Sequence, residues 1–213
     1  MRGTPSPMLD TLHQRLQTLR PHTLAHLALP QAAVLLPIVD RATPTLLFTR
    51  RARHLTTHRG QVAFPGGKRD PGDHDLYATA LREAEEEIAL SPAQVQPLGR
   101  LSDVLSLHGL QVTPWVGVIP PDLPLRAAPD ELDAIFEVPL AYFLDDRRTH
   151  TDVINADGRT WYVPSYRVDD YVIWGLSAMM LVELLAEGFG MDIDLSRRPG
   201  GVLRQHPARS LSR

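Results

Sequence analysis

The stretch AFPGGKRDPGDHDLYATALREAEEEIAL, residues Ala63–Leu90, joins a glycine pair to a run of three glutamates. Its second half predicts a helix from about Asp75 to Ala89, because apolar residues recur at helical spacing and Ser91-Pro92 ends the pattern. Its first half is rich in turn-forming residues, and Gly66 and Gly67 allow a backbone to approach a ligand closely. The stretch therefore predicts a pliable glycine turn followed by a strongly acidic helix.

The glutamates of this helix are not equivalent. At a turn of about 100° per residue, Glu83, Glu86 and Glu87 share one face, while Glu85 falls on the far side. A neighbouring stripe of the same helix is apolar and suits packing on a sheet. The helix therefore predicts one wall in the core and a carboxylate wall beside it. The apolar stripe consists of Tyr77, Leu81, Ala84 and Ile88.

The carboxylate wall needs positive charge, because like charges three and four residues apart repel each other. Arg82 lies four residues before Glu86, but one arginine does not balance three carboxylates. Two interpretations follow, a solvated acidic surface or a site for Mg²⁺ or Mn²⁺, which prefer oxygen ligands and often share their shell with phosphates. The apolar stripe and the preceding glycines favour the metal site, with a backbone carbonyl at Gly67 as a further ligand.

The bulk composition excludes several classes of protein. A chain of 213 residues can bury one domain, and a net charge of -3 gives no reason to expect nucleic-acid or membrane partners. The absence of cysteine excludes disulfides, thiolate metal sites and a thiol nucleophile. No apolar run reaches the roughly 18 residues of a spanning helix, and the N-terminus does not resemble a signal peptide. We expect a cytoplasmic protein.

The remaining chain predicts a mixed sheet flanked by helices, an α/β/α sandwich. We expect a helical extension packed on the domain in residues 1–30, the main domain in 31–190 and a basic, poorly ordered tail in 191–213. Asp157-Gly158 predicts a hairpin. Helices are expected at Met8–Leu19 and Val172–Gly190, and strands at Ala32–Val39, Thr45–Arg51 and within residues 60–67, 109–120 and 134–144.

The acidic helix resembles the Nudix box of the Nudix hydrolases. That motif begins with a Gly and a Glu in a loop, continues with Arg-Glu and, after two residues, Glu-Glu, and ends with Gly and an aliphatic residue. Arg82, Glu83, Glu86 and Glu87 match that motif. The sequence departs from it in three ways: Ala89 replaces the last Gly, Asp73 stands where the first Glu would be, and the spacing from Gly67 to Arg82 is one residue longer. Either of two aspartates, Asp70 or Asp73, takes the first acid's role or serves as a turn residue or helix cap.

The segment LLFTRRARHLTTHRGQVAFPGG, residues 46–67, is similar to the one that marks the coenzyme A pyrophosphatase subgroup. Thr56 departs from it, since a basic residue is usual there. The stretches VTPWVG, FEVPL and IWGLSA also resemble that subgroup, so the likeness runs from Ala32 to Leu185. The segment concentrates arginines, whose guanidinium forks suit phosphate oxygens, although each arginine alone is also typical of a solvated surface. The implied substrate-binding residues are Arg51, Arg53, His58, Arg59, Gln61, Gly66 and Lys68.

The resemblance implies a Nudix-type fold and hydrolysis of coenzyme A or acyl-CoA to 3′,5′-ADP and (acyl-)4′-phosphopantetheine. Mg²⁺ or Mn²⁺ would be held by Glu83, Glu86, Glu87 and Gly67. Glu86, oriented by Arg82, is the expected base, and a loop acid such as Glu131 is the alternative. Two other functions stay open, a hydrolase of ADP-ribose or NADH and a non-catalytic nucleotide-binding module. The assembly is a monomer or a homodimer.

Overall fold

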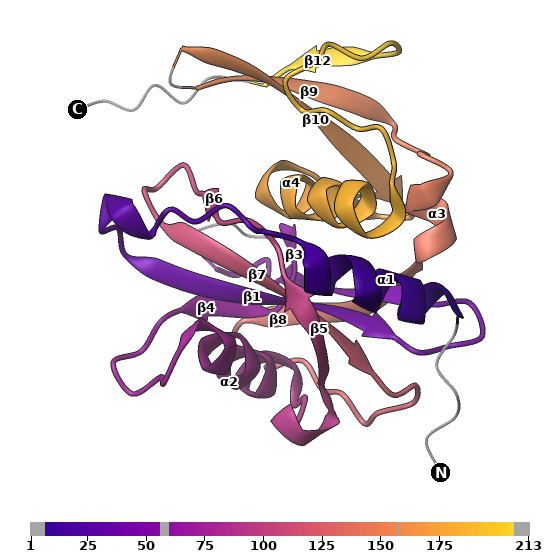
Figure 1. The fold of residues 1–213 in the computed structure, drawn as a ribbon. Coiled ribbons are helices and arrows are strands. Elements are labelled where there is room, and N and C mark those ends of the chain that lie inside the picture. The colour runs from indigo at the N-terminus through magenta and orange to yellow at the C-terminus, as the bar shows by residue number, and fades with distance from the viewer. Residues whose placement is uncertain (1–6, 56–59, 157, 207–213) are drawn as a thin grey trace.

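The computed structural model describes residues 7–55, 60–156 and 158–206 (Figure 1). Its centre is a sheet in which β1 (Gln31–Val39) and β7 (Gln111–Ile119) run parallel over their whole length. Both strands are largely apolar, as expected when helices cover both faces of a sheet. The other strands are β2 (Thr45–Arg51), β3 (Val62–Ala63), β4 (Gly66–Lys68), β5 (Gln96–Arg100), β6 (Val104–Leu105) and β8 (Leu132–Pro139).

The strand order of this eight-stranded sheet is β3-β2-β1-β7-β5. Three more strands join beside that path, because β4 pairs with β1, β6 with β7 and β8 with β2. The predicted hairpin of the first two strands is confirmed, with Ile38 opposite Leu46. The predicted strands at residues 109–120 and 134–144 are confirmed as β7 and β8. After β8 the chain turns into the short helix α3 (Leu140–Leu144).

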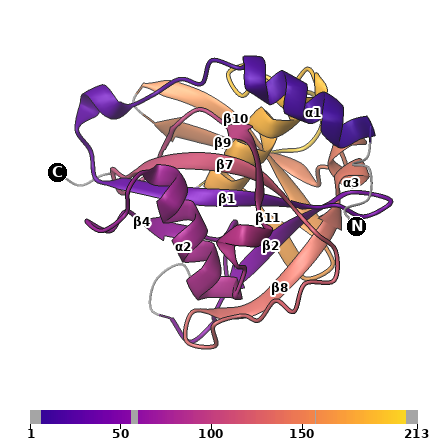
Figure 2. The ribbon, with the colours of Figure 1, turned by 60° about the horizontal axis from the view of Figure 1, so that its bottom comes forward.

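Helices cover the two faces of this sheet. One face carries α2 (Leu76–Ile88), which lies across β1 and β4 (Figure 2). The opposite face carries α1 (Pro7–Thr18) and α4 (Gly175–Glu183) (Figure 1). Two cores result, one of α2 with the residues of β1 that point to it and one around α1 and α4. The mixed α/β sandwich predicted from the sequence is confirmed.

A second sheet lies beyond α4, with the order β11-β10-β9-β12 (Figure 1). It contains the predicted hairpin next to Gly158, formed by β9 (His150–Ala156) and β10 (Arg159–Val168). The expectation of one sheet is therefore wrong. The hairpin pairs with β11 (Tyr171–Ile173) and packs on α4, instead of extending the first sheet. Within the expected C-terminal tail, the short strand β12 (Leu203–Gln205) pairs in parallel with β9.

The N-terminal helix is an integral part of one core. Leu9, Leu12 and Leu16 of α1 are buried, and Leu12 is fully inaccessible. The helix packs on β5 and on the π-helical turn Leu184–Gly188 that continues α4. Gly188 has no side chain, and a Cβ there would collide with Leu12. The boundaries of extension, domain and tail stay predictions. No helix in the described ranges is long and apolar enough to cross a membrane.

Candidate active site

Local sequence fixes where α2 begins and ends. Asp75 caps the helix, because its carboxylate accepts a hydrogen bond from the Ala78 N–H at 2.8 Å. The helix ends at Ala89, which has the left-handed conformation with φ 56° that glycine usually supplies. Ala84 and Ile88 are fully buried against the sheet. This packing directs the neighbouring carboxylate wall towards β4, as the spacing of the glutamates predicts.

Arg82 organises the acids on this wall. Its Nη1 lies 3.1 Å from Oε1 of Glu83 and 3.0 Å from Oε2 of Glu86. Its Nε donates to Asp73 at 2.9 Å, and Nη2 donates to the second oxygen of Asp73 at 3.1 Å. This fork holds the pKa of Asp73 well below its usual range. Arg82 is thus held at one end and orients two carboxylates at the other.

Asp73, not Asp70, is the aspartate that anchors Arg82. Its Oδ2 also accepts from the Asp70 N–H at 2.9 Å and from the Thr79 hydroxyl at 2.8 Å. The same side chain closes the turn before the helix and fixes the arginine. The sequence alone does not decide between Asp70 and Asp73, because the extra residue in the loop obscures which aspartate reaches Arg82.

Glu87 and Glu83 are the most enclosed acids of the wall. Glu87 is only 5% exposed, and burial raises the pKa of its carboxyl to about 7. A hydrogen bond of 3.0 Å from the Gly66 N–H acts in the opposite direction and lowers that pKa. Burial also raises the pKa of Glu83, although Arg82 opposes the shift. Glu86 has a side chain that is 59% exposed, and Glu85 is exposed as well. The wall thus combines two desolvated carboxylates with one that reaches solvent.

The predicted glycine turn is a short strand. Gly66 and Gly67 form β4 with Lys68 and pair antiparallel with Val34 and Ala33 of β1. A Cβ on Gly66 would collide with the Ala33 carbonyl, and one on Gly67 would lie 2.5 Å from the carboxyl atoms of Glu83. The pair is thus fixed by strand pairing, and its glycines are needed because β1 and the acidic helix approach so closely.

The Pro-rich segment after β7 joins this site, a role that the sequence left open. The Arg126 N–H donates to the Ile88 carbonyl at 3.0 Å, and the Ala128 N–H donates to the Glu87 carbonyl at 2.8 Å. The segment thereby satisfies backbone carbonyls at the end of α2. The Glu131 carbonyl accepts from the Ala52 N–H at 2.8 Å, and the charge of Glu131 contributes to the raised pKa values of both Glu83 and Glu87.

Apart from Gly66, whose N–H donates to Glu87, the expected substrate-binding residues divide into three groups. Arg51 lies close enough to Glu87 for its charge to lower that carboxyl's pKa, and its buried Nε has no hydrogen-bond partner among the described residues. The Arg51 N–H donates to the Gln61 carbonyl at 2.9 Å, which places Gln61 beside it. Arg53 and Lys68 are exposed, although the Lys68 carbonyl accepts from Arg82 at 3.0 Å. His58 and Arg59 lie outside the described residues.

The carboxylate wall fits a hard divalent cation in its chemistry. Its donors are carboxylate oxygens, which such a cation prefers. Two of the carboxyls, those of Glu83 and Glu87, are desolvated groups of like charge. Gly67 also leaves open the space beside Glu83 that a Cβ would fill. Within the described part of the chain, no three histidine, aspartate or glutamate side chains already converge as a metal cluster. Arg82 instead pairs with two of the acids.

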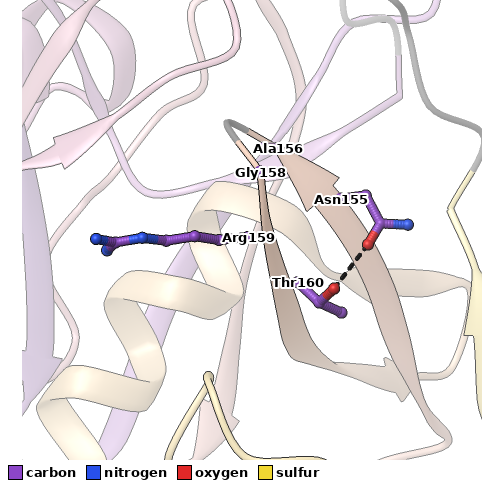
Figure 3. A pocket seen from close by; sticks show the side chains of 5 residues that line it. All are labelled: Asn155, Ala156, Gly158, Arg159 and Thr160. Carbon is purple, nitrogen blue, oxygen red and sulfur yellow. Dashed lines mark hydrogen bonds between the residues drawn. The ribbon is translucent and has the colours of Figure 1, made fainter.

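A hollow of about 320 Å³ at the turn of the β9–β10 hairpin is separate from this wall. Figure 3 shows Thr160 donating to Asn155 at 2.9 Å, while Arg159 points away from both. The hairpin lies beyond α4, on the other side of the main sheet from α2 (Figure 1). The acids therefore belong to a different surface. The hollow is lined by Asn155, Ala156, Gly158, Arg159 and Thr160.

Comparison with known proteins identifies similar chains. A family model of the NUDIX domain matches residues 29–158. A Shigella sonnei (strain Ss046) protein named uncharacterized Nudix hydrolase NudL is 49% identical over 183 residues, 84% of this chain and 94% of the relative. A protein of the same name from Escherichia coli O1:K1 / APEC is 49% identical over 180 residues, 83% and 92% of the two chains. A solved MutT/nudix family protein from Enterococcus faecalis has a TM-score of 0.48 and 12% identity, covering 88% of this chain and 76% of that one.

Proposed function

The chain belongs to the family of Nudix hydrolases, and we propose that it cleaves the pyrophosphate bond of coenzyme A or acyl-CoA. The products are 3′,5′-ADP and (acyl-)4′-phosphopantetheine. The observation that carries the proposal is the position of Arg51 near the desolvated Glu87, with a buried Nε that has no hydrogen-bond partner within residues 7–55, 60–156 and 158–206. A guanidinium at this place suits a phosphate oxygen. Arg51 also belongs to the segment that resembles the coenzyme A pyrophosphatases.

Glu83, Glu86 and Glu87 are the proposed ligands of Mg²⁺ or Mn²⁺, with the Gly67 carbonyl as a further oxygen donor. A bound divalent ion supplies charge neutralisation for the phosphates and makes a water more acidic. The Gly66 N–H keeps Glu87 in place at 3.0 Å. Arg82 keeps Glu83 and Glu86 in place while Asp73 holds its other edge. The chain thus supplies a set of oxygens whose orientation is fixed before substrate arrives.

Glu86 is the proposed general base. Its side chain is the most exposed of the three, which gives it access to water, and Arg82 orients it. Water attacks a phosphorus of the pyrophosphate, Glu86 accepts the proton, and the bond between the bridging oxygen and that phosphorus breaks. Each product leaves with a phosphate monoester. No residue of the chain forms a covalent intermediate in this scheme.

A product assay tests the proposal. The protein is incubated with coenzyme A and either Mg²⁺ or Mn²⁺, and the nucleotides are separated by ion-exchange chromatography. We expect 3′,5′-ADP and 4′-phosphopantetheine in equal amounts, and none of either in excess chelator. Absence of 3′,5′-ADP with both metals would refute the coenzyme A assignment. Turnover of ADP-ribose or NADH in the same assay would then identify a different nucleoside-diphosphate specificity.

A further inference from the structure

The strand β3 accepts hydrogen bonds from two side-chain hydroxyls, one from the main sheet and one from the helix α4. The Thr49 Oγ1 donates to the Ala63 carbonyl at 3.1 Å, and the Ser177 Oγ donates to the Val62 carbonyl at 3.1 Å. Thr49 belongs to β2, whereas Ser177 belongs to α4, more than a hundred residues later in the chain. Both carbonyls of this two-residue strand therefore accept a hydrogen bond from a hydroxyl.

Both hydroxyls are buried, so these bonds are protected from competing water. Thr49 is 1% exposed and Ser177 is 7% exposed. β3 ends the strand order of the main sheet and pairs with β2 only through Thr49 and Arg50. Such a short edge strand has little backbone pairing of its own. The two hydroxyls therefore add to the core packing of Val62, which is 5% exposed, in fixing the position of β3.

β3 directly follows Gln61 and so fixes the end of the Arg51–Gln61 segment. That segment is closed at its base by two backbone bonds, from the Arg51 N–H to the Gln61 carbonyl at 2.9 Å and from the Gly60 N–H to the Arg51 carbonyl at 3.0 Å. The glycine strand β4 on the other side has independent support from β1, and the Leu35 N–H donates to the Pro65 carbonyl at 2.9 Å. Arg51 itself also pairs with Leu132 of β8. Movement of β3 would therefore displace Gln61, and the bond that joins it to Arg51, more than the carboxylate wall.

We propose that Ser177, together with Thr49, is a positioning residue for substrate binding, acting through β3 on Arg51 and Gln61. This inference rests on the proposed function, since it assigns Arg51 and Gln61 to the substrate. It also gives the IWGLSA stretch around Ser177 a role, because that stretch places one hydroxyl of the distal helix under the substrate-binding segment.

The test compares the steady-state constants of three variants on coenzyme A. Ser177→Ala and Thr49→Val each remove one hydroxyl, and each should raise KM by roughly threefold to tenfold, the range of one lost neutral hydrogen bond. Their kcat should stay near that of the wild type, because the carboxylates of α2 keep their own supports. Thr45→Val is the matched control. Thr45 lies on the same strand and is also buried, but its hydroxyl donates to Glu137.

A wild-type KM in both Ser177→Ala and Thr49→Val would overturn the inference, and so would an equal rise of KM in Thr45→Val. A loss of kcat without a change of KM would also overturn it, since that result indicates a disturbed acidic wall. Failure of the wild type to cleave coenzyme A contradicts the proposed function instead. The same variants are then compared on ADP-ribose, or by the calorimetric dissociation constant of coenzyme A if neither compound is cleaved.

Discussion

Glu85 and Glu86 are neighbours in the sequence but differ in their contacts. Glu86 meets Arg82 at 3.0 Å, whereas Glu85 is exposed on the other side of α2. We predict that Glu86→Gln lowers kcat by about 10²- to 10⁴-fold, the usual contribution of a general base. Glu85→Gln should change kcat little, and it serves as the matched control. Both are measured as steady-state rates of 3′,5′-ADP release at saturating metal.

Equal losses in the two variants would contradict the assignment of roles on this helix. Glu83→Gln and Glu87→Gln extend the test to the proposed metal ligands. Each should lower kcat by orders of magnitude and weaken Mn²⁺ binding, measured by isothermal titration. Glu85→Gln should leave Mn²⁺ binding unchanged.

Glu87 also predicts a pH dependence of stability in the metal-free protein. Its pKa is raised from 4.5 to about 7 on folding, so the unfolded chain gives up this proton at lower pH than the folded chain does. The contribution of Glu87 to the stability of the metal-free protein therefore falls as the pH rises from about 4.5 to 7. Glu87→Gln removes this loss. In chelator, the variant should be more stable than the wild type at pH 8 and nearly equal to it at pH 4.

The measurement is urea unfolding of both proteins across that pH range, with the difference between them plotted against pH. The difference reports Glu87 together with its repulsion of Glu83, whose charge helps to raise the Glu87 pKa. The lowered pKa of Asp73 is common to both proteins. A variant that is less stable than the wild type at pH 8 would show that the Glu87 carboxylate is not destabilised by its burial. The expected outcome is a gain of stability at the expense of activity, as is common at active sites.

At the scale of one element, the end of α2 carries an avoidable strain. Ala89 has a left-handed conformation, with φ 56° and ψ 31°, which costs an L-residue roughly 1–2 kcal/mol relative to glycine. We predict that Ala89→Gly raises the free energy of unfolding by about 1 kcal/mol, after the greater chain entropy of glycine in the unfolded state is counted. Chemical denaturation measures the change.

The control for this prediction is Ala84→Gly, five residues earlier on the same helix. Ala84 is fully buried in the helix interior, where glycine destabilises by roughly 0.5–1 kcal/mol from chain entropy alone. The two identical substitutions should therefore change stability in opposite directions. Destabilisation by both would contradict the strained end of the helix.

The elements differ in how well the sequence predicts them. The spacing of Glu83, Glu86 and Glu87 beside Ala84 and Ile88 is a local property of one helix, so it predicts which side chains share a face. The strands β1 and β7 are also evident, because buried parallel strands are continuously apolar. The hairpin at Gly158 follows from its turn residues.

The contacts between distant segments are less accessible to sequence reasoning. No local sequence feature distinguishes a hairpin that extends the main sheet from one that packs beyond α4. The strand β12 depends on a distant partner, because it pairs with the free edge of β9. The strand pairing of Gly66 and Gly67 depends on the position of β1. The bond from Gly66 to Glu87 depends on the packing of α2. The contact between Asp73 and Arg82 is different. It lies within one short segment, and a better alignment of the loop with the family motif would have predicted it.

At the scale of the whole molecule, α1 contributes buried leucines to the core that it shares with α4. Leu12 is fully buried and fills the space that Gly188 leaves open. We predict that Leu12→Ala lowers the free energy of unfolding by about 2–5 kcal/mol, the usual cost of such a cavity. Met8→Ala, on the same helix but 38% exposed, should change it little. Urea unfolding of both variants checks this, and a small effect of Leu12→Ala would favour an independent extension.

The fold brings four separate segments to one surface: the end of β2 with Arg51, the glycine strand, the acidic helix and the segment that ends at Glu131. We propose that the acidic helix and the glycine strand hold the metal and that the other two segments select the nucleotide derivative. The proposal that this derivative is coenzyme A depends on those two segments. A measurement of substrate preference therefore tests the proposed coenzyme A specificity more directly than a measurement of hydrolysis alone.

That measurement is a competition assay in which the protein, with Mg²⁺ or Mn²⁺, receives equal concentrations of coenzyme A, ADP-ribose and NADH. The products are distinguished by chromatography, since coenzyme A yields 3′,5′-ADP and the other two yield AMP. We predict that 3′,5′-ADP forms fastest and that Arg51→Ala reduces this preference. Faster formation of AMP by the wild-type protein would contradict the coenzyme A assignment.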